Sequence, residues 1–350
     1  RRTSIMPKRF LGNIMTDAPT APAGNFQHLS TSGVWSLNEA FGYRKADVWP
    51  TAGNVLQRAI FAGGATASSA VNVIEFFNFT SAGNAADFGD LTKNRDGGPA
   101  GIGSSTRGII AGGQDSSPDI DYISILSQGN AVDFGDLQTF QGTGTARQEL
   151  GGGGNETRGI IVGTAVPSGA NKIEYVTIAS LGNSVDFGDT TANSSDNQAR
   201  AAGSTTRLIF GGFQQNKDHS EYITIGSTGN SQEFGDLGGD TFSNSAVVSS
   251  STRCVWMGGS NTDNMVYVTI ASTGAGSAFG NLTASRRMGA GASNKTLGTI
   301  MGGDPVASPY RTNIIEQITI ATAANSTDWG DLTAAKRQAA GLSNAHGGLS

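Results

Sequence analysis

The chain has 350 residues with a net charge of −5, 51 glycines and only 15% charged residues. A composition with few charges and many turn-forming glycines is typical of an all-β protein, and a closed array of repeats can hold this length in one domain. The acidic balance argues against nucleic acid as a partner, and no apolar run approaches the roughly 18 residues that cross a membrane.

Residues 1–33 are predicted to form an extended N-terminal arm. The segment "DAPTAPAG" from Asp17 is rich in Pro and Ala and cannot build a core. Basic residues gather here although the whole chain is acidic, which favours anchoring in an assembly. The expected anchoring residues are Arg1, Arg2, Lys8, Arg9 and Trp35.

Residues 34–50 are predicted to form a connector that holds one short helix. Ser36 and Glu39 have the spacing of a capping box, and Pro50 ends the segment. Arg1 instead of Met at the first position indicates a chain that is trimmed, processed or incomplete.

A Phe-Gly-Asp triplet recurs along the rest of the chain and gives the period of a repeat. Its aromatic residues are 46, 53, 47, 45 and 50 residues apart. Periods near 50 belong to propellers and solenoids, in which each copy is one supersecondary unit. The aromatic positions are Phe88, Phe134, Phe187, Phe234, Phe279 and Trp329.

Each repeat contains four pieces that are typical of short strands. The first is a buried apolar run such as "RGIIAGG" from Arg107, and the second is a tyrosine strand such as "IDYISI" from Ile120. The third is the Phe-Gly-Asp strand, which a Gly-Asn reversal such as Gly129-Asn130 joins to the second. The fourth is a weak strand such as "ARAAGST" from Ala199.

Six copies of these pieces predict a six-bladed β-propeller of four-stranded antiparallel blades over residues 51–350. The last copy of the weak strand, "AAGLSN" from Ala339, has no apolar run after it. We expect it to pair with the run at Arg58 and close the ring. A seventh blade that draws on residues 34–57 is the alternative.

The period and the Gly-Gly after each apolar strand resemble the kelch repeat family. More narrowly, "YVTIASLGNSVDFGD" from Tyr175 and "STTRLIFGG" from Ser204 resemble kelch-like repeats in virion proteins of tailed bacteriophages, marine ones especially. The resemblance covers about residues 55–345. It implies a propeller in a virion structural protein, and the missing regular Tyr and Trp pair speaks against the functions of common kelch adaptors.

Paired carboxylates recur once per blade, whereas a catalytic pair is needed only once. A structural pairing with the repeated arginines that begin the apolar runs is therefore expected, with calcium binding and catalysis as the alternatives. The acids are Asp87/Asp90, Asp133/Asp136, Asp186/Asp189, Glu233/Asp236 and Asp328/Asp331. The arginines are Arg58, Arg107, Arg158, Arg207 and Arg253.

Other reactive side chains do not form a pattern. The repeated tyrosines, such as Tyr122, are expected in packing between blades, and Cys254 is expected to be buried and inert. A single cysteine also excludes an internal disulfide framework. Catalytic, metal-binding and cofactor-binding residues are not predicted.

The sequence predicts a non-enzymatic virion protein, made in the host cytoplasm, associated with the tail or a fibre and present in multiple copies. Its expected partners are other virion proteins and a protein or glycan of the host surface. Capsid-surface decoration, and a carbohydrate-binding or adhesion module outside a virion, are the alternatives. An enzyme would be favoured by a polar cluster in one blade that the other blades lack.

The loops on one side of the ring vary in length and sequence, whereas those on the other side repeat. Loops that vary can carry residues that recognise a partner, because the fold does not require one conformation of them. The variable side is therefore expected to carry the partner or receptor contact. The candidate contacts are Phe140, Gln214, His219 and Tyr310.

Overall fold

A computed structural model describes residues 9–10, 13–14, 56–113, 118–138, 147–163, 171–191, 199–213, 218–239, 242–260, 262–306 and 310–349. The chain divides into two compact units, Arg1–Leu56 and Gln57–Ser350. In the first unit, β1 (Arg9–Phe10) and β2 (Asn13–Ile14) pair antiparallel. The rest of the expected arm and the helix expected within residues 34–50 lie outside the described residues.

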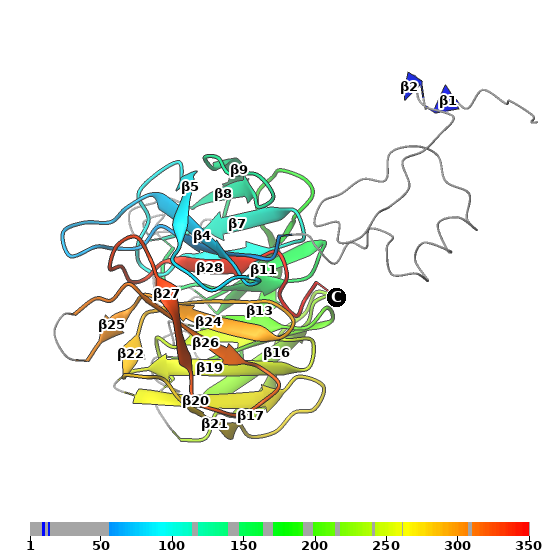
Figure 1. Cartoon of the computed structure of the whole chain (residues 1–350). Helices are drawn as coiled ribbons and strands as arrows, with labels where there is room; N and C mark the ends of the chain where they lie inside the picture. Colours follow the sequence, from blue (N-terminus) through cyan, green and yellow to red (C-terminus); the bar gives the residue numbers. More distant parts are fainter. Residues whose placement is uncertain are drawn as a thin grey trace, which may run out of the picture. The chain divides into compact units, whose positions relative to one another are not determined.

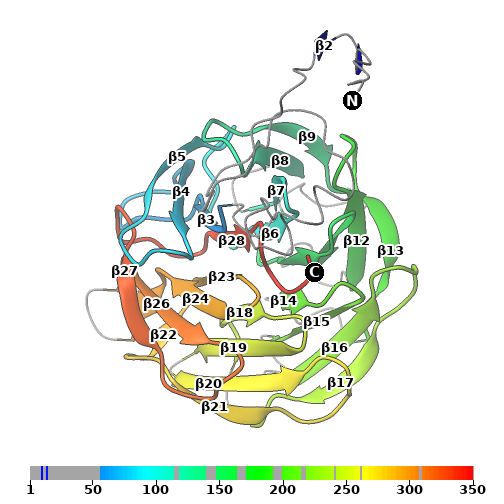
Figure 2. The same cartoon turned by 45° about the vertical axis from the view of Figure 1, so that its right-hand side comes forward.

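The second unit is a six-bladed propeller of four-stranded antiparallel sheets, which confirms the predicted fold class (Figures 1 and 2). Within each blade, the strands follow one another from the axis of the ring to its rim. Blade 1 is β28 (Ala340–Ser343), β3 (Arg58–Ala62), β4 (Val73–Asn78) and β5 (Ala86–Asp90). Blade 2 is β6 (Ala100–Gly103), β7 (Arg107–Ala111), β8 (Asp119–Ser124) and β9 (Val132–Asp136). Blade 3 is β10 (Gly151–Gly154), β11 (Arg158–Val162), β12 (Lys172–Thr177) and β13 (Val185–Asp189).

Blade 4 is β14 (Arg200–Gly203), β15 (Arg207–Gly211), β16 (His219–Thr224) and β17 (Gln232–Asp236). Blade 5 is β18 (Ala246–Ser249), β19 (Arg253–Gly259), β20 (Thr262–Thr269) and β21 (Ser277–Asn281). Blade 6 is β23 (Ala290–Ser293), β24 (Leu297–Met301), β26 (Ile314–Thr319) and β27 (Thr327–Asp331). β22 (Arg286–Arg287) and β25 (Asp304–Pro305) form a short ribbon, and β22 contacts β19 and β20 of blade 5.

The C-terminal strand closes the ring. Strand β28 pairs antiparallel with β3, and the register places Ala340 opposite Ala62 and Ser343 opposite Ala59. Figure 2 shows β28 among the inner strands, beside β3. Blade 1 is thus built from both ends of the propeller sequence, as the weak terminal copy led us to expect.

The core consists of layers between neighbouring blades. The second strand of a blade, such as β7, is buried over most of its length because another blade covers each of its faces. One apolar cluster, for example, joins Ile109 and Phe134 of blade 2 to Ile161 and Val176 of blade 3. Every contact surface in the ring is therefore a junction between two blades, and each junction takes the numbers of its two blades, such as junction 1/2.

Inner strands carry small residues because they crowd around the propeller axis. Strand β10 is four consecutive glycines. A Cβ atom added to Gly103 would lie 2.0 Å from the carbonyl oxygen of Ser343 on the neighbouring inner strand, which no real side chain tolerates. The weak strand signal in the sequence follows from this crowding.

A β-bulge recurs between the third and outer strands of every blade. In blade 2 the register shifts between Ile120 and Asp121, so that Phe134 is the extra residue on the outer strand. Bulges re-aim side chains next to them. In blade 2 the residue that follows the shift, Asp121, is turned into the junction with the preceding blade, where it meets buried polar partners.

Candidate functional site

The Phe-Gly-Asp motif fastens a blade to the turn between the third and outer strands of the next blade, and this turn is Gly-Asn in four of the six blades. At junction 1/2, the Gly129 amide donates to the Phe88 carbonyl at 2.9 Å, and Asn130 Oδ1 accepts from the Asp90 amide at 3.1 Å. The glycine of the motif allows this approach, because a Cβ on Gly89 would lie 2.5 Å from the Gly129 oxygen. The two repeated motifs of the sequence are thus the two halves of one contact.

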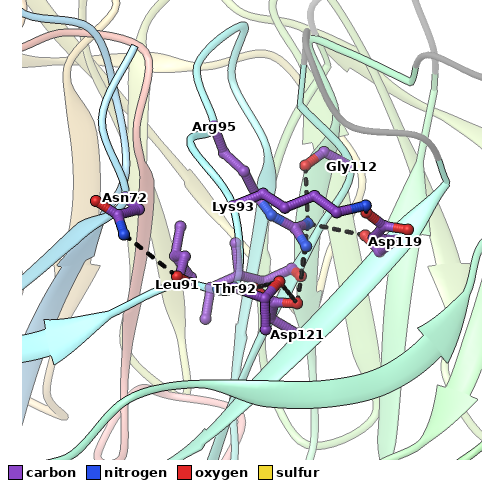
Figure 3. A network of polar contacts seen from close by, with 9 residues as sticks. Asn72, Leu91, Thr92, Lys93, Arg95, Gly112, Asp119 and Asp121 are labelled. Carbon is purple, nitrogen blue, oxygen red and sulfur yellow. Dashed lines mark hydrogen bonds and ion pairs between the residues drawn. The ribbon is translucent and has the colours of Figure 1, made fainter.

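A buried ion pair lies deeper in the same junction (Figure 3). Asp121 and Arg95 have exposed side-chain fractions of 1% and 0%, and Arg95 Nη2 lies 2.8 Å from Asp121 Oδ1. The Thr92 amide donates to Asp121 Oδ2 at 3.0 Å, and its hydroxyl donates to Oδ1 at 2.8 Å. Arg95 Nη1 also donates to the carbonyls of Asp119 and Gly112 at 2.8 and 3.1 Å. Both charges are therefore compensated at close range, as burial requires.

The same arrangement recurs around the ring with changing partners. The buried acid lies on the third strand of one blade, and a cation and a hydroxyl or amide donor come from the segment after the preceding Phe-Gly-Asp strand. The pairs are Arg147 with Glu174 at 2.7 Å, Arg286 with Glu316, and Lys336 with Glu75 at 2.9 Å.

Two junctions of blade 4 depart from this pattern. At junction 3/4, Glu221 faces His219 Nε2 at 3.2 Å, a partner that comes from its own strand. At junction 4/5, Val266 takes the place of the acid and Phe242 the place of the cation, and both belong to one apolar cluster. Gly238 stands where Thr92 donates in junction 1/2. Acid, cation and donor are thus replaced together.

The repeated arginines of the apolar runs do not pair with the Phe-Gly-Asp carboxylates, which corrects the pairing expected from the sequence. Arg107 Nη1 instead donates to the Ile178 carbonyl of the next blade at 2.9 Å, and its guanidinium lies 5.0 Å from the centre of the Tyr122 ring. The outer-strand acid Asp133 is exposed, on the solvent side of the blade, where water stabilises its charge. The same carbonyl bond is made by Arg58, Arg158, Arg207 and Arg253.

Sequence reasoning missed the buried acids. A signal for them is present in the sequence. On the third strand, an acid directly precedes the tyrosine in "IDY", "IEY" and "SEY" and the glutamine in "IEQ", whereas Val266 replaces the acid in "MVY".

Serine side chains link the inner strands around half of the axial channel. Ser343 Oγ donates to the Ser293 carbonyl, Ser293 Oγ donates to the Ser249 carbonyl at 2.9 Å, and Ser249 Oγ donates to the Gly203 carbonyl at 2.8 Å. On the other half, the inner strands end in glycine, and the C-terminal residues occupy the space that is left.

His346 lies in that space, against the glycine side of the channel. Its Nε2 lies 2.9 Å from the Gly103 carbonyl, and the Gly348 amide donates to Nδ1 at 3.1 Å. Since Nδ1 accepts, Nε2 carries the proton and donates. Burial lowers the pKa of His346 below its ordinary value of 6.5, and the bond to Gly103 only partly opposes this. Two cavities along the channel hold about 50 Å³ each, room for a few water molecules.

The residues expected at the partner surface are only partly described. Tyr310 is 73% exposed, as a contact residue should be. His219 is half-buried and bonded to Glu221, so it belongs to a blade junction. Phe140, Gln214, Arg1, Arg2, Lys8 and Trp35 lie outside the described residues, as does the Arg9 side chain.

In the described part of the chain the potential metal ligands are dispersed and the one thiol is buried. His, Cys, Asp and Glu do not gather there in groups of three that could hold a metal ion. Cys254 is buried, burial raises its pKa, and its thiol donates to the Ala202 carbonyl. Within the same described residues, helices long and apolar enough to cross a membrane are absent.

Comparison of the sequence with protein-family models and with curated proteins gave no match.

Proposed function

We propose that this chain is a non-enzymatic structural protein of a tailed-bacteriophage virion, associated with the tail or a fibre, in which a rigid propeller is presented to neighbouring proteins and to the host surface. The observation that carries the proposal is that the repeated polar residues form contacts between neighbouring blades. Among the described residues, buried ion pairs join neighbouring blades at four of the six junctions, so features that define the repeat serve the stiffness of the ring.

The axial channel supports a presenting role over a catalytic one. Many propellers leave a central channel in which a ligand can bind. In this ring serine side chains and the C-terminal segment fill much of it, and the cavities that remain hold about 50 Å³ each. Contacts with partners then fall on the outer surfaces and loops.

The resemblance of the repeats to kelch-like repeats of phage virion proteins supplies the virion part of the proposal. The basic N-terminal segment, with Arg1, Arg2, Lys8 and Arg9, supplies the anchor. Other virion proteins are the partners of the arm, and the variable loops around Tyr310 are the side proposed to face the host.

Removal of residues 1–33 tests this function. The truncated chain should fold with an unchanged melting temperature but should be missing from purified particles when it replaces the full chain during infection. A variant with Phe140, Gln214 and Tyr310 changed to Ala is the comparison: it should enter particles and reduce adsorption to host cells. Normal incorporation of the truncated chain would overturn the anchoring role.

A further inference from the structure

Blade 4 contains a surface pocket of about 240 Å³ at the end of its β16–β17 hairpin. Phe187 of blade 3 and Ile223 line it with side chains that are almost fully buried. Its polar wall is formed by Tyr222, Thr228, Asn230 and Gln232, with Arg207 at one side. The pocket opens at the Gly-Asn end of the blade, away from the variable loops.

The charged side chain that lines the pocket, Arg207, already has two partners. Arg207 Nη1 donates to the Ile270 carbonyl at 2.7 Å, and its guanidinium lies 4.4 Å from the centre of the Tyr222 ring. A guanidinium held by a carbonyl and a ring is poorly placed to bind an anion face-on. What the pocket offers a ligand is therefore neutral hydrogen-bonding capacity.

The neutral groups are two amides and several hydroxyls. The Tyr222 hydroxyl donates to Gln232 Oε1 at 2.5 Å, and Asn230 Oδ1 accepts from the Asp189 amide at 3.0 Å. Each carboxamide thus has its oxygen engaged, and its NH₂ group remains as a donor. Ser227 and Thr228 add hydroxyls that can donate or accept.

This combination occurs in blade 4 and not at the corresponding positions of the other blades. Gln232 lies opposite Tyr222 in the β16–β17 register. The residue in the same register position is Ala86, Val132, Val185, Ser277 and Thr327 in blades 1, 2, 3, 5 and 6. Gly226 further opens the turn, because a Cβ there would meet no atom within 4 Å. The fold of a blade does not need Gln232.

We infer that this pocket is a subsite for one neutral sugar ring. Ligand sites combine apolar surface with a few polar groups that fix orientation. Amide donors and hydroxyls match the vicinal hydroxyls of a pyranose. A volume of about 240 Å³ is enough for a single ring. The inference goes beyond the proposed function and does not depend on it, because the pocket opens away from the variable loops that are proposed to face the host.

The chain supplies its own test variant. Gln232→Val installs the residue that blades 2 and 3 carry opposite the tyrosine, so the blade should fold normally. Ser277→Val, at the same position of blade 5, is the matched control. Binding is measured by saturation-transfer NMR on the full chain, with the methyl glycosides of glucose, galactose, mannose and N-acetylglucosamine as probes.

At least one glycoside should bind saturably to the wild-type chain and to Ser277→Val, and Gln232→Val should weaken its binding tenfold or more at an unchanged melting temperature. The inference is overturned if none of the four binds, if Gln232→Val binds as well as wild type, or if Ser277→Val weakens binding equally. Particle incorporation is measured separately: Gln232→Val should enter particles normally, so loss of the sugar site and failure of the virion role are distinguishable.

Discussion

The ion pair at junction 1/2 should be stabilising only as a complete unit. Arg95→Ala leaves Asp121, whose side chain is 1% exposed, without its cation and removes the donors to the carbonyls of Asp119 and Gly112. Breaking a buried pair by removing one partner costs about 3–5 kcal/mol. Total unfolding free energies are about 5–15 kcal/mol, so this loss is a large fraction of the stability. Solvent screening gives no relief, because Arg95 is fully buried.

Junction 4/5 provides the matched replacement. Arg95→Phe, Asp121→Val and Thr92→Gly together copy the residues of that junction, and well-packed apolar replacement of a buried pair is often neutral. The triple variant should therefore unfold at a higher urea concentration than Arg95→Ala, by an amount equivalent to about 2 kcal/mol or more. Urea titrations followed by tryptophan fluorescence measure both. If Arg95→Ala costs less than about 1 kcal/mol, or if the triple variant is the less stable of the two, acid, cation and donor do not act as one closed unit.

Three further predictions concern the closing strand, the contact between the Phe-Gly-Asp and Gly-Asn motifs, and the two histidines. Deletion of residues 339–350 removes β28 and bares the edge of blade 1, so light scattering should detect aggregation and the cooperative melt should be lost; an unchanged melt would contradict the closure. Gly135→Ala should destabilise more than Gly129→Ala, since both have positive φ but only the first brings a Cβ to 2.5 Å from a carbonyl oxygen; equal urea midpoints would refute this. The pKa of His346 is lowered by burial, so the unfolded chain binds more protons, and stability falls as the pH drops through 6.5. The pKa of His219 is raised by its carboxylate partner. The stability that His219 contributes is therefore present below pH 6.5 and is lost as the pH rises through the folded pKa. Melting temperatures between pH 5 and 8 should accordingly show opposite pH trends in the effects of His346→Gln and His219→Gln, and parallel trends would disprove the assignment.

The propeller could be predicted because its determinants are local and repeat in register. The Gly-Asn reversal, the Phe-Gly-Asp strand and the apolar run each lie within a few residues of one another, and their order is the strand order of a blade. Closure was predictable as well, because a terminal copy of one strand had only one unpaired partner, the run at Arg58.

The junction cations were harder to predict because their distance from the motif varies. Arg95 follows Asp90 by 5 residues, whereas Arg147 follows Asp136 by 11, since the loop between them differs in length. Counted back from the inner strand the spacing is nearly constant: Arg147 stands 4 residues before β10, and Arg95 stands 5 before β6. When the repeats are aligned on the Phe-Gly-Asp motif, these cations fall out of register, because their position is set by the inner strand that follows them.

The repeated arginines were assigned to the wrong partner for a related reason. An acid and a base that recur together in every repeat suggest an ion pair. A strand, however, places alternate side chains on opposite faces. The guanidinium of Arg107 lies over Tyr122 and reaches the carbonyl of the next blade, whereas Asp133 faces solvent on the outer strand. The partner of a repeated cation in this ring is a backbone oxygen.

The departures from the repeat are concentrated in blade 4. One junction of this blade uses the titratable His219 where the others use Arg or Lys, and its other junction replaces the pair with Phe242 and Val266. Its hairpin holds the amide Gln232 where two other blades hold valine. In a repeat protein, each blade contacts only its neighbours, so the ring tolerates one blade with different junctions as long as both remain packed. A blade that differs at both junctions and also at its outer hairpin is therefore the one in which a function beyond folding can be accommodated, and this makes the pocket at Gln232 the first surface to test.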